Sequence, residues 1–129
     1  MNHFRAGFPH SSSLYIIARS KAGAFKHVGI LLPDGRVAHC SPERGEHIST
    51  VENFAMGQDV ATIEEIPQRL RVLTLRRIAE SMRLPKDYHA TKNNCEMFVN
   101  RMLDRNETSP QLNAVLIIAG IVLFGFATA

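Results

Sequence analysis

The pattern of apolar and polar residues predicts three strands in the first third of the chain. These strands lie at 14–19 (LYIIAR), 26–32 (KHVGILL) and 36–41 (RVAHCS). Each segment is rich in β-branched or aromatic residues and is bounded by turn-forming residues. Pro33-Asp34-Gly35 is a strong turn signal between the second and third strands, and Pro42 ends the third. The polar residues 42–48 predict a loop.

The following residues predict mainly helices. Ser49, with Glu52 three positions on, fits a capping box and predicts a short helix that passes Phe54 and ends at Gly57. The further predicted elements are a strand over 60–66 with one wet face and helices over 70–82 and 94–103. Because strands come first and helices mostly later, we expect an α+β fold with an antiparallel sheet packed on helices.

The C-terminal residues differ from the rest of the chain. Residues 112–129 (LNAVLIIAGIVLFGFATA) carry no charge. As a helix they would be roughly 27 Å long, close to the ~30 Å hydrocarbon core of a bilayer. They predict a transmembrane anchor, with a buried core helix as the alternative. Arg101 and Arg105 precede this segment and favour a domain facing the cytosol. The expected division is an N-terminal segment at 1–13, a domain at 14–104, a linker at 105–111 and the anchor at 112–129.

The composition adds a mildly basic character to this picture. The chain has 129 residues, a net charge of +3 and 45% hydrophobic residues, which exclude a disordered chain. A basic balance suits an anionic membrane or nucleic acid, and the apolar C-terminus makes the bilayer the expected partner rather than nucleic acid. A basic stretch is either a solvated helix face or a surface attracted to anionic lipid head groups. It contains Arg69, Arg71, Arg76, Arg77 and Arg83.

Cys95 is a candidate nucleophile because it begins a predicted helix. Asn93 can cap this helix, and Glu96 follows three positions later. Backbone N–H groups and the positive end of the helix dipole favour a thiolate in the first turn. The alternative is a small buried apolar residue, which is also what we expect of Cys40. Two cysteines make no disulfide framework and suit a reducing compartment.

Two histidines lie on the first predicted hairpin. If residues 33–35 form a three-residue loop with a left-handed glycine, Leu31 faces Val37. His27 and His39 are then diagonal neighbours on one face, with backbones roughly 7–8 Å apart. A two-residue loop would instead put the two histidines on opposite faces. The proposed chemistry therefore depends on the type of loop.

These residues together suggest a nucleophile, a base and an orienting group. Gly29 is expected opposite His39 and would leave room for an imidazole. We predict that His27 deprotonates Cys95 and that His39 holds His27 in position. A zinc site made by the same three residues and Cys40 is the alternative. Adjacent residues of a strand point to opposite faces, which counts against placing His39 and Cys40 on one metal.

Three segments and the apolar C-terminus resemble the lecithin:retinol acyltransferase-like (H-box/NC) family. In layout the chain is similar to its phospholipase A and acyltransferase (HRAS-like suppressor) group. The segments are KHVGILLPDGRVAH (Lys26–His39), TVENFAMG (Thr50–Gly57) and NCEMFVNRML (Asn94–Leu103). The resemblance implies a circularly permuted papain-like fold, related to NlpC/P60 proteins. It also implies a membrane-anchored phospholipase A1/A2 and acyltransferase that forms a Cys95 acyl-thioester, with His27 as base and His39 as third member. No metal or other cofactor is expected of such an enzyme.

Two other functions stay open. A membrane-anchored regulatory or viral replication protein would keep the fold for binding without catalysis. Met97 motivates this alternative, since the family usually has histidine after its Asn-Cys-Glu triplet. The other is a thiol peptidase or amidase of the NlpC/P60 type. A cell-wall enzyme of that kind should be exported, and residues 1–20 lack the pattern of a signal peptide.

Overall fold

The computed structural model describes residues 13–20 and 26–105. Five strands form one antiparallel sheet in the order β4-β3-β2-β1-β5. The strands are β1 (Tyr15–Ser20), β2 (Lys26–Leu31), β3 (Arg36–Ser41), β4 (Gly45–Thr50) and β5 (Val60–Glu65). The helices are α2 (Val51–Ala55), the 3₁₀ turn η1 (Gln68–Leu70), α3 (Arg71–Arg83) and α4 (Cys95–Met102). The predicted α+β class and antiparallel sheet are confirmed.

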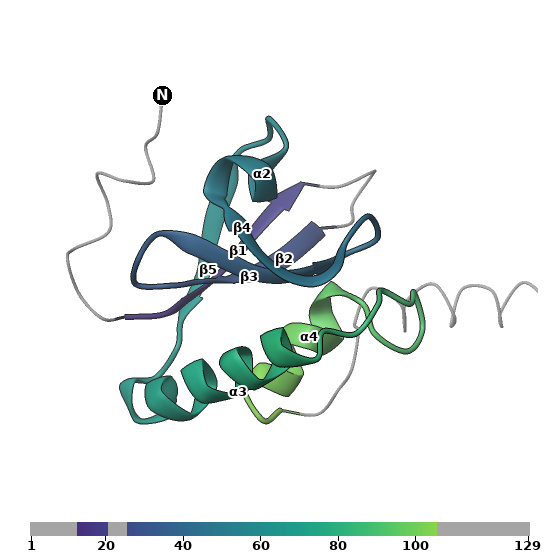
Figure 1. Cartoon of the computed structure of the whole chain (residues 1–129). Helices are drawn as coiled ribbons and strands as arrows, with labels where there is room; N and C mark the ends of the chain where they lie inside the picture. Colours follow the sequence, from purple (N-terminus) through teal and green to yellow (C-terminus); the bar gives the residue numbers. More distant parts are fainter. Residues whose placement is uncertain (1–12, 21–25, 106–129) are drawn as a thin grey trace, which may run out of the picture.

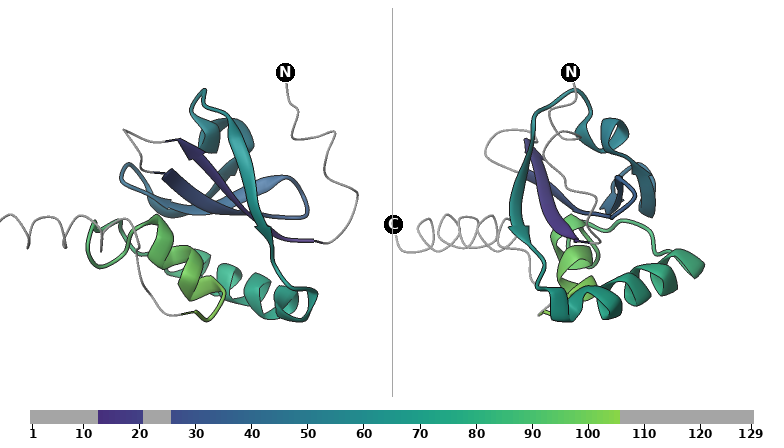
Figure 2. Two further views of the ribbon diagram at one scale, coloured as in Figure 1. Left: turned by 180° about the vertical axis from the view of Figure 1, so that it is seen from behind. Right: turned by 90° about the vertical axis from the view of Figure 1, so that its left-hand side faces the viewer.

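Helices lie on both faces of the sheet, with α2 on one side and α3 and α4 on the other (Figures 1 and 2). The smaller apolar cluster, on the α2 side, contains Ile17, Leu31, Val37 and Phe54. The larger, on the α3–α4 side, includes Ile30, Ala38, Cys40, Ile78, Phe98 and Met102. Because strand side chains alternate, odd-numbered residues of β2 and β3 face α2 and even-numbered ones face α3 and α4.

The β2–β3 hairpin has the predicted register. Leu31 pairs with Val37, and Ile30 pairs with Ala38. Gly35 has a φ of +88°, the left-handed conformation that the three-residue loop requires and that glycine adopts without strain. The backbone N–H of residue 32 donates to the carbonyl of residue 36 across the loop, at 2.8 Å. This register brings His27 and His39 to the α2 face.

The predicted loop at 42–48 is wrong, because most of it belongs to β4. His47 of this strand pairs with His39, and Gly45 pairs with Ser41. The strand buries polar side chains, among them Glu46 and Ser49. It therefore lacks the apolar alternation by which a strand is recognised in a sequence.

Both predicted helix caps are displaced by one residue. Thr50, not Ser49, caps α2, and its hydroxyl accepts a hydrogen bond from the backbone N–H three residues on. Asn94, not Asn93, caps α4 in the same way. The displacement leaves the Ser49 and Asn93 side chains available for contacts elsewhere in the fold.

The later elements agree with the sequence pattern. The predicted strand at 60–66 and helices at 70–82 and 94–103 correspond to β5, α3 and α4. No helix within residues 13–20 and 26–105 is both long and apolar enough to cross a membrane. The predicted anchor at 112–129 lies outside the described residues, as do residues 1–12 and most of the predicted linker.

Candidate active site

The two predicted histidines are in direct contact. His27 Nε2 and His39 Nδ1 are 2.8 Å apart, a hydrogen bond between β2 and β3. Both side chains are buried, with 1% and 4% of their surface exposed. The rings meet edge to face, with centroids 5.1 Å apart. The structure therefore joins two of the three residues predicted for the site.

Phe54 of α2 covers this pair. Its ring centroid lies 5.2 Å from that of His27 and 5.1 Å from that of His39. Gly29 makes this possible because its missing side chain leaves room for the Phe54 ring. A Cβ at Gly29 would lie 2.8 Å from Val37 Cγ1 and 2.9 Å from Phe54 Cε2. The missing side chain thus admits Phe54 and Val37, and Phe54 shields the histidines.

Ser49 is a member of the site that sequence reasoning missed. Its Oγ lies 2.8 Å from His39 Nε2, on the side of the ring away from His27. The same hydroxyl donates to the carbonyl of Thr50 at 3.1 Å. Recognition of β4 as a strand would have found it, because alternation places Ser49 on the face of its cross-strand partner Val37.

His47 also lies beside the pair, although no role was predicted for it. Its ring centroid is 4.1 Å from that of His39, its cross-strand partner. Its Nδ1 donates to the carbonyl of Gly45 at 2.8 Å. His89 is exposed on the loop before α4, and His3 and His10 lie outside the described residues.

His39 is held in its neutral form. Burial lowers its pKa from 6.5 to about 2, with further lowering by the positive charges of His47, His27, Arg19 and Arg44. A neutral imidazole has one donor and one acceptor nitrogen. His39 therefore acts on His27 through hydrogen bonding rather than through charge.

Cys95 is the first residue of α4 and is 5% exposed. Its Sγ lies 4.0 Å from the carbonyl oxygen of Lys26, the residue before His27. The body of α4 packs on the sheet face opposite the histidine rings, so the cysteine reaches the start of β2 only because it begins the helix. Cys95 therefore lies at the end of the sheet where β2 begins, at Lys26, one residue before His27 in that strand.

The guanidinium group of Arg19 lies close to the end of the sheet where Cys95 meets the start of β2. Arg19 pairs with His27 across β1 and β2, and its Nε donates to the carbonyl of Phe54 at 2.5 Å. Burial lowers the pKa of Arg19, and attraction to the negative charges of Glu43 and Cys95 opposes that lowering. By reciprocity, the guanidinium favours the thiolate of Cys95.

Cys40 faces away from the site. It lies in the cluster on the α3–α4 side, and its Sγ donates to the carbonyl of Asn93 at 3.5 Å. Burial raises the pKa of its thiol to about 12, helped by the negative charges of Glu46 and Cys95. The predicted structural role is thus supported. Since His39 points to the other face, the alternative zinc site is not formed, and the described part of the chain holds no group of three or more potential metal ligands.

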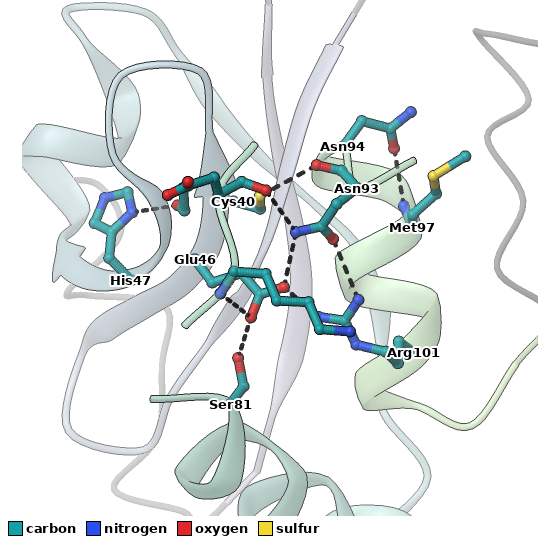
Figure 3. A network of polar contacts seen from close by, with 11 residues as sticks. Cys40, Glu46, His47, Ser81, Asn93, Asn94, Met97 and Arg101 are labelled. Carbon is teal, nitrogen blue, oxygen red and sulfur yellow. Dashed lines mark hydrogen bonds and ion pairs between the residues drawn. The ribbon is translucent and has the colours of Figure 1, made fainter. Parts of the chain in front are cut away.

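A second polar cluster fixes the start of α4 (Figure 3). Glu46 accepts hydrogen bonds from Ser81 Oγ at 2.7 Å, Asn93 Nδ2 at 2.9 Å and the backbone N–H of Lys86 at 3.2 Å. It also forms an ion pair with Arg101 of α4. Burial would raise the pKa of Glu46, but these donors outweigh it and the pKa is lowered. No sequence pattern predicted this cluster, which joins β4, α3 and α4.

Comparison of the chain with protein-family models, curated proteins and solved structures finds no match. The site is therefore defined by its own geometry. That geometry consists of a buried histidine pair on one sheet face, in which His39 is neutral, and a cysteine that begins a helix at the sheet's end.

Proposed function

We propose that the protein is a cysteine-dependent phospholipase A1/A2 and acyltransferase of the lecithin:retinol acyltransferase-like family, with a papain-like (NlpC/P60) fold. Cys95 is the nucleophile, His27 the base and His39 the residue that orients the base. The observation that carries the proposal is the 2.8 Å hydrogen bond between His27 and His39, with Cys95 Sγ beside the neighbouring Lys26 carbonyl.

In the proposed reaction His27 takes the thiol proton of Cys95, and the thiolate attacks an ester carbonyl of a phospholipid. The C–O bond breaks, the protonated His27 returns its proton to the leaving lysophospholipid, and an acyl thioester remains on Cys95. Water, an amine or an alcohol then loses a proton to His27 and attacks the thioester. The acyl product leaves, and the thiolate recovers the proton. Two such transfers have lower barriers than one attack by a weak nucleophile.

The electrostatics around Cys95 support its role. It occupies the first turn of α4, where the helix dipole stabilises an anion, and Arg19 adds a nearby cation. Cys40, in contrast, has a thiol whose pKa is raised to about 12. Burial therefore keeps the Cys40 thiol protonated, and Cys95 is the cysteine that we propose attacks the ester.

The surface of α3 and of the residues that flank it, Arg69 in η1 and Leu84 at the helix end, supports a lipid partner. Exposed apolar side chains include Val72 and Leu84, which are 61% and 84% exposed. Arg69, Arg76 and Arg83 are exposed among them, whereas Arg77 is half-buried and donates to the Met102 carbonyl. Basic and apolar side chains together suit the head-group region of an anionic bilayer. With 112–129 as the anchor, the protein would act on the membrane that holds it, from the cytosolic side.

The test is intact-mass spectrometry of the full chain after exposure to phosphatidylcholine vesicles. We expect an added acyl mass that maps to Cys95, release of fatty acid, and neither in Cys95→Ala. Cys40→Ala is the matched control and should keep the adduct. Absence of both adduct and fatty acid in the wild-type protein, with Cys95→Ala indistinguishable from it, would overturn the proposal.

The burial of the site favours a second candidate, a membrane-anchored regulatory or replication protein that uses the fold for binding. His27 is 1% exposed and Cys95 is 5% exposed, so a bulky ester reaches neither without movement. This candidate predicts that Cys95→Ala retains biological activity and that deletion of 112–129 abolishes it. Loss of activity in Cys95→Ala alone would exclude it.

A further inference from the structure

The hydroxyl of Ser49 has one proton, and its contacts determine where that proton lies. Ser49 Oγ is 3.1 Å from the Thr50 carbonyl oxygen, which only accepts hydrogen bonds. The proton of Ser49 is therefore directed to Thr50. In its second contact, at 2.8 Å from His39 Nε2, Ser49 Oγ is then the acceptor, and His39 Nε2 carries a hydrogen.

The same reasoning extends to the next ring. His39 is neutral, because its pKa is lowered to about 2, so a hydrogen on Nε2 leaves a lone pair on Nδ1. That Nδ1 lies 2.8 Å from His27 Nε2 and accepts its hydrogen. When His27 is in its neutral form, its own lone pair is then on Nδ1, the nitrogen that does not face His39.

The opposite direction of donation would have a different consequence. If Ser49 gave its proton to His39 Nε2, His39 Nδ1 would donate to His27 Nε2, and the hydrogen of His27 would lie on Nδ1. That arrangement loses the hydrogen bond from Ser49 to the Thr50 carbonyl. It also places the lone pair of His27 on Nε2, the nitrogen that faces His39, so that Nδ1 is no longer basic. The direction of the Ser49 hydrogen bond thus decides which nitrogen of His27 is basic.

We propose that Ser49 is a positioning residue, which sets the tautomer of His27 through a chain of hydrogen bonds from the Thr50 carbonyl through Ser49 and His39. The displaced helix cap is what frees Ser49 for this role, since Thr50 caps α2 in its place. The inference rests on the proposed function only for what the basic nitrogen does, namely take the proton of Cys95. The tautomers themselves can be measured without any substrate.

The test is a long-range ¹H–¹⁵N correlation spectrum of the full chain labelled at histidine nitrogens, near neutral pH. We expect His27 and His39 of the wild-type protein both to carry their hydrogen on Nε2. Ser49→Ala should give mixed or inverted tautomers, and Ser49→Thr, which keeps the hydroxyl, should restore the wild-type spectrum. Ser81→Ala is the matched control, because it removes a serine hydroxyl that contacts Glu46 and not the histidines.

A second measurement links the tautomer to the cysteine. Equal population of two tautomers halves the competent form, so Ser49→Ala should slow alkylation of Cys95 by iodoacetamide at least about twofold. Ser49→Thr should alkylate at the wild-type rate. A wild-type His27 with its hydrogen on Nδ1, or tautomers unchanged in Ser49→Ala, would overturn the inference. If Cys95 resists alkylation even in the wild-type protein, the proposed function loses its nucleophile, while the spectra still decide the role of Ser49.

Discussion

Glu46 and Arg101 form an ion pair between β4 and α4, with the Glu46 side chain 1% exposed and that of Arg101 25% exposed. Asn93 joins the pair, since it donates to Glu46 and accepts from Arg101 at 3.2 Å. Because Asn93 is two residues before Cys95, this contact fixes where α4 begins. The candidate nucleophile is therefore positioned by residues on the opposite side of the sheet from the histidines.

Loss of this pair should be strongly destabilising. Arg101→Met leaves the buried Glu46 carboxylate without its charged partner, which costs about 3–5 kcal/mol of unfolding free energy. Arg105→Met is the matched control, because Arg105 and Glu64 pair on the surface with 42% and 40% exposure. Its effect should be below about 1 kcal/mol. Urea unfolding of both variants measures the difference, and equal losses would contradict the structural role of the buried pair.

Stability should fall on mild acidification because of His39. An unfolded His39 binds a proton near pH 6.5, whereas the folded one, with its pKa lowered to about 2, does not. The unfolded state therefore binds more protons below pH 6.5, and stability is lost as pH falls, by at most about 1.4 kcal/mol per unit. Urea midpoints between pH 7.5 and 5 measure this slope. His39→Gln should reduce it, and a flat profile in the wild-type protein would count against a buried neutral His39.

A second loss of stability, caused by protonation of Glu46, should begin at lower pH. The pKa of Glu46 is lowered from 4.5 by its donors despite the opposing effect of burial. Its contribution is present above about pH 4.5 and is lost as pH falls through the folded value. Arg101→Met should therefore flatten the profile below pH 4.5 more than between 7.5 and 5. The same urea series on this variant separates the contribution of Glu46 from that of His39.

Local signals in the sequence were sufficient to predict the hairpin but not the strand beside it. Gly35 and the preceding Pro33-Asp34 specify their own turn, so the register that joins His27 and His39 followed from neighbours in the chain. The strand β4 depends on distant partners. Glu46 is stabilised by Ser81 and residues further on, some 35 or more positions away. Without those partners a buried glutamate looks like a loop residue.

The candidate site likewise contains residues that local sequence patterns predict and one residue that they do not. The histidine pair and the helix that begins at Cys95 were predictable from strand alternation and capping residues. Ser49 was assigned to a helix cap because the pattern Ser-x-x-Glu fits one. Thr50 and Asn53 offer an equally good cap one residue later. In the folded protein Thr50 caps the helix and Ser49 contacts His39, and no local pattern reports that contact.

The destabilisation caused by a side chain at position 29 should depend on Phe54. A Cβ at Gly29 meets Val37 Cγ1 at 2.8 Å and Phe54 Cε2 at 2.9 Å, so Gly29→Ala forces the phenyl ring away from the histidines. We expect a loss of about 1–3 kcal/mol in unfolding free energy. In a Phe54→Leu background, which relieves part of the overlap, the same alanine should cost less by at least about 0.5 kcal/mol. If the two substitutions lower the unfolding free energy additively in this double-mutant cycle, overlap with Phe54 is not the cause of the loss.

The exposed face of α3 should contribute charge-dependent lipid binding. Arg76 and Arg83 are exposed on this helix, and each basic residue near an anionic surface contributes about 1 kcal/mol, or roughly fivefold in affinity. Arg76→Gln and Arg83→Gln together should therefore lower binding of the full chain to phosphatidylserine-containing vesicles by about twenty-five-fold. Binding to pure phosphatidylcholine should be unchanged, because the variant keeps the anchor that we propose at 112–129. Arg36→Gln, an exposed arginine on the β2–β3 hairpin, is the matched control. An equal loss in that variant would assign the effect to net charge, and the α3 face would then have no special part in membrane binding.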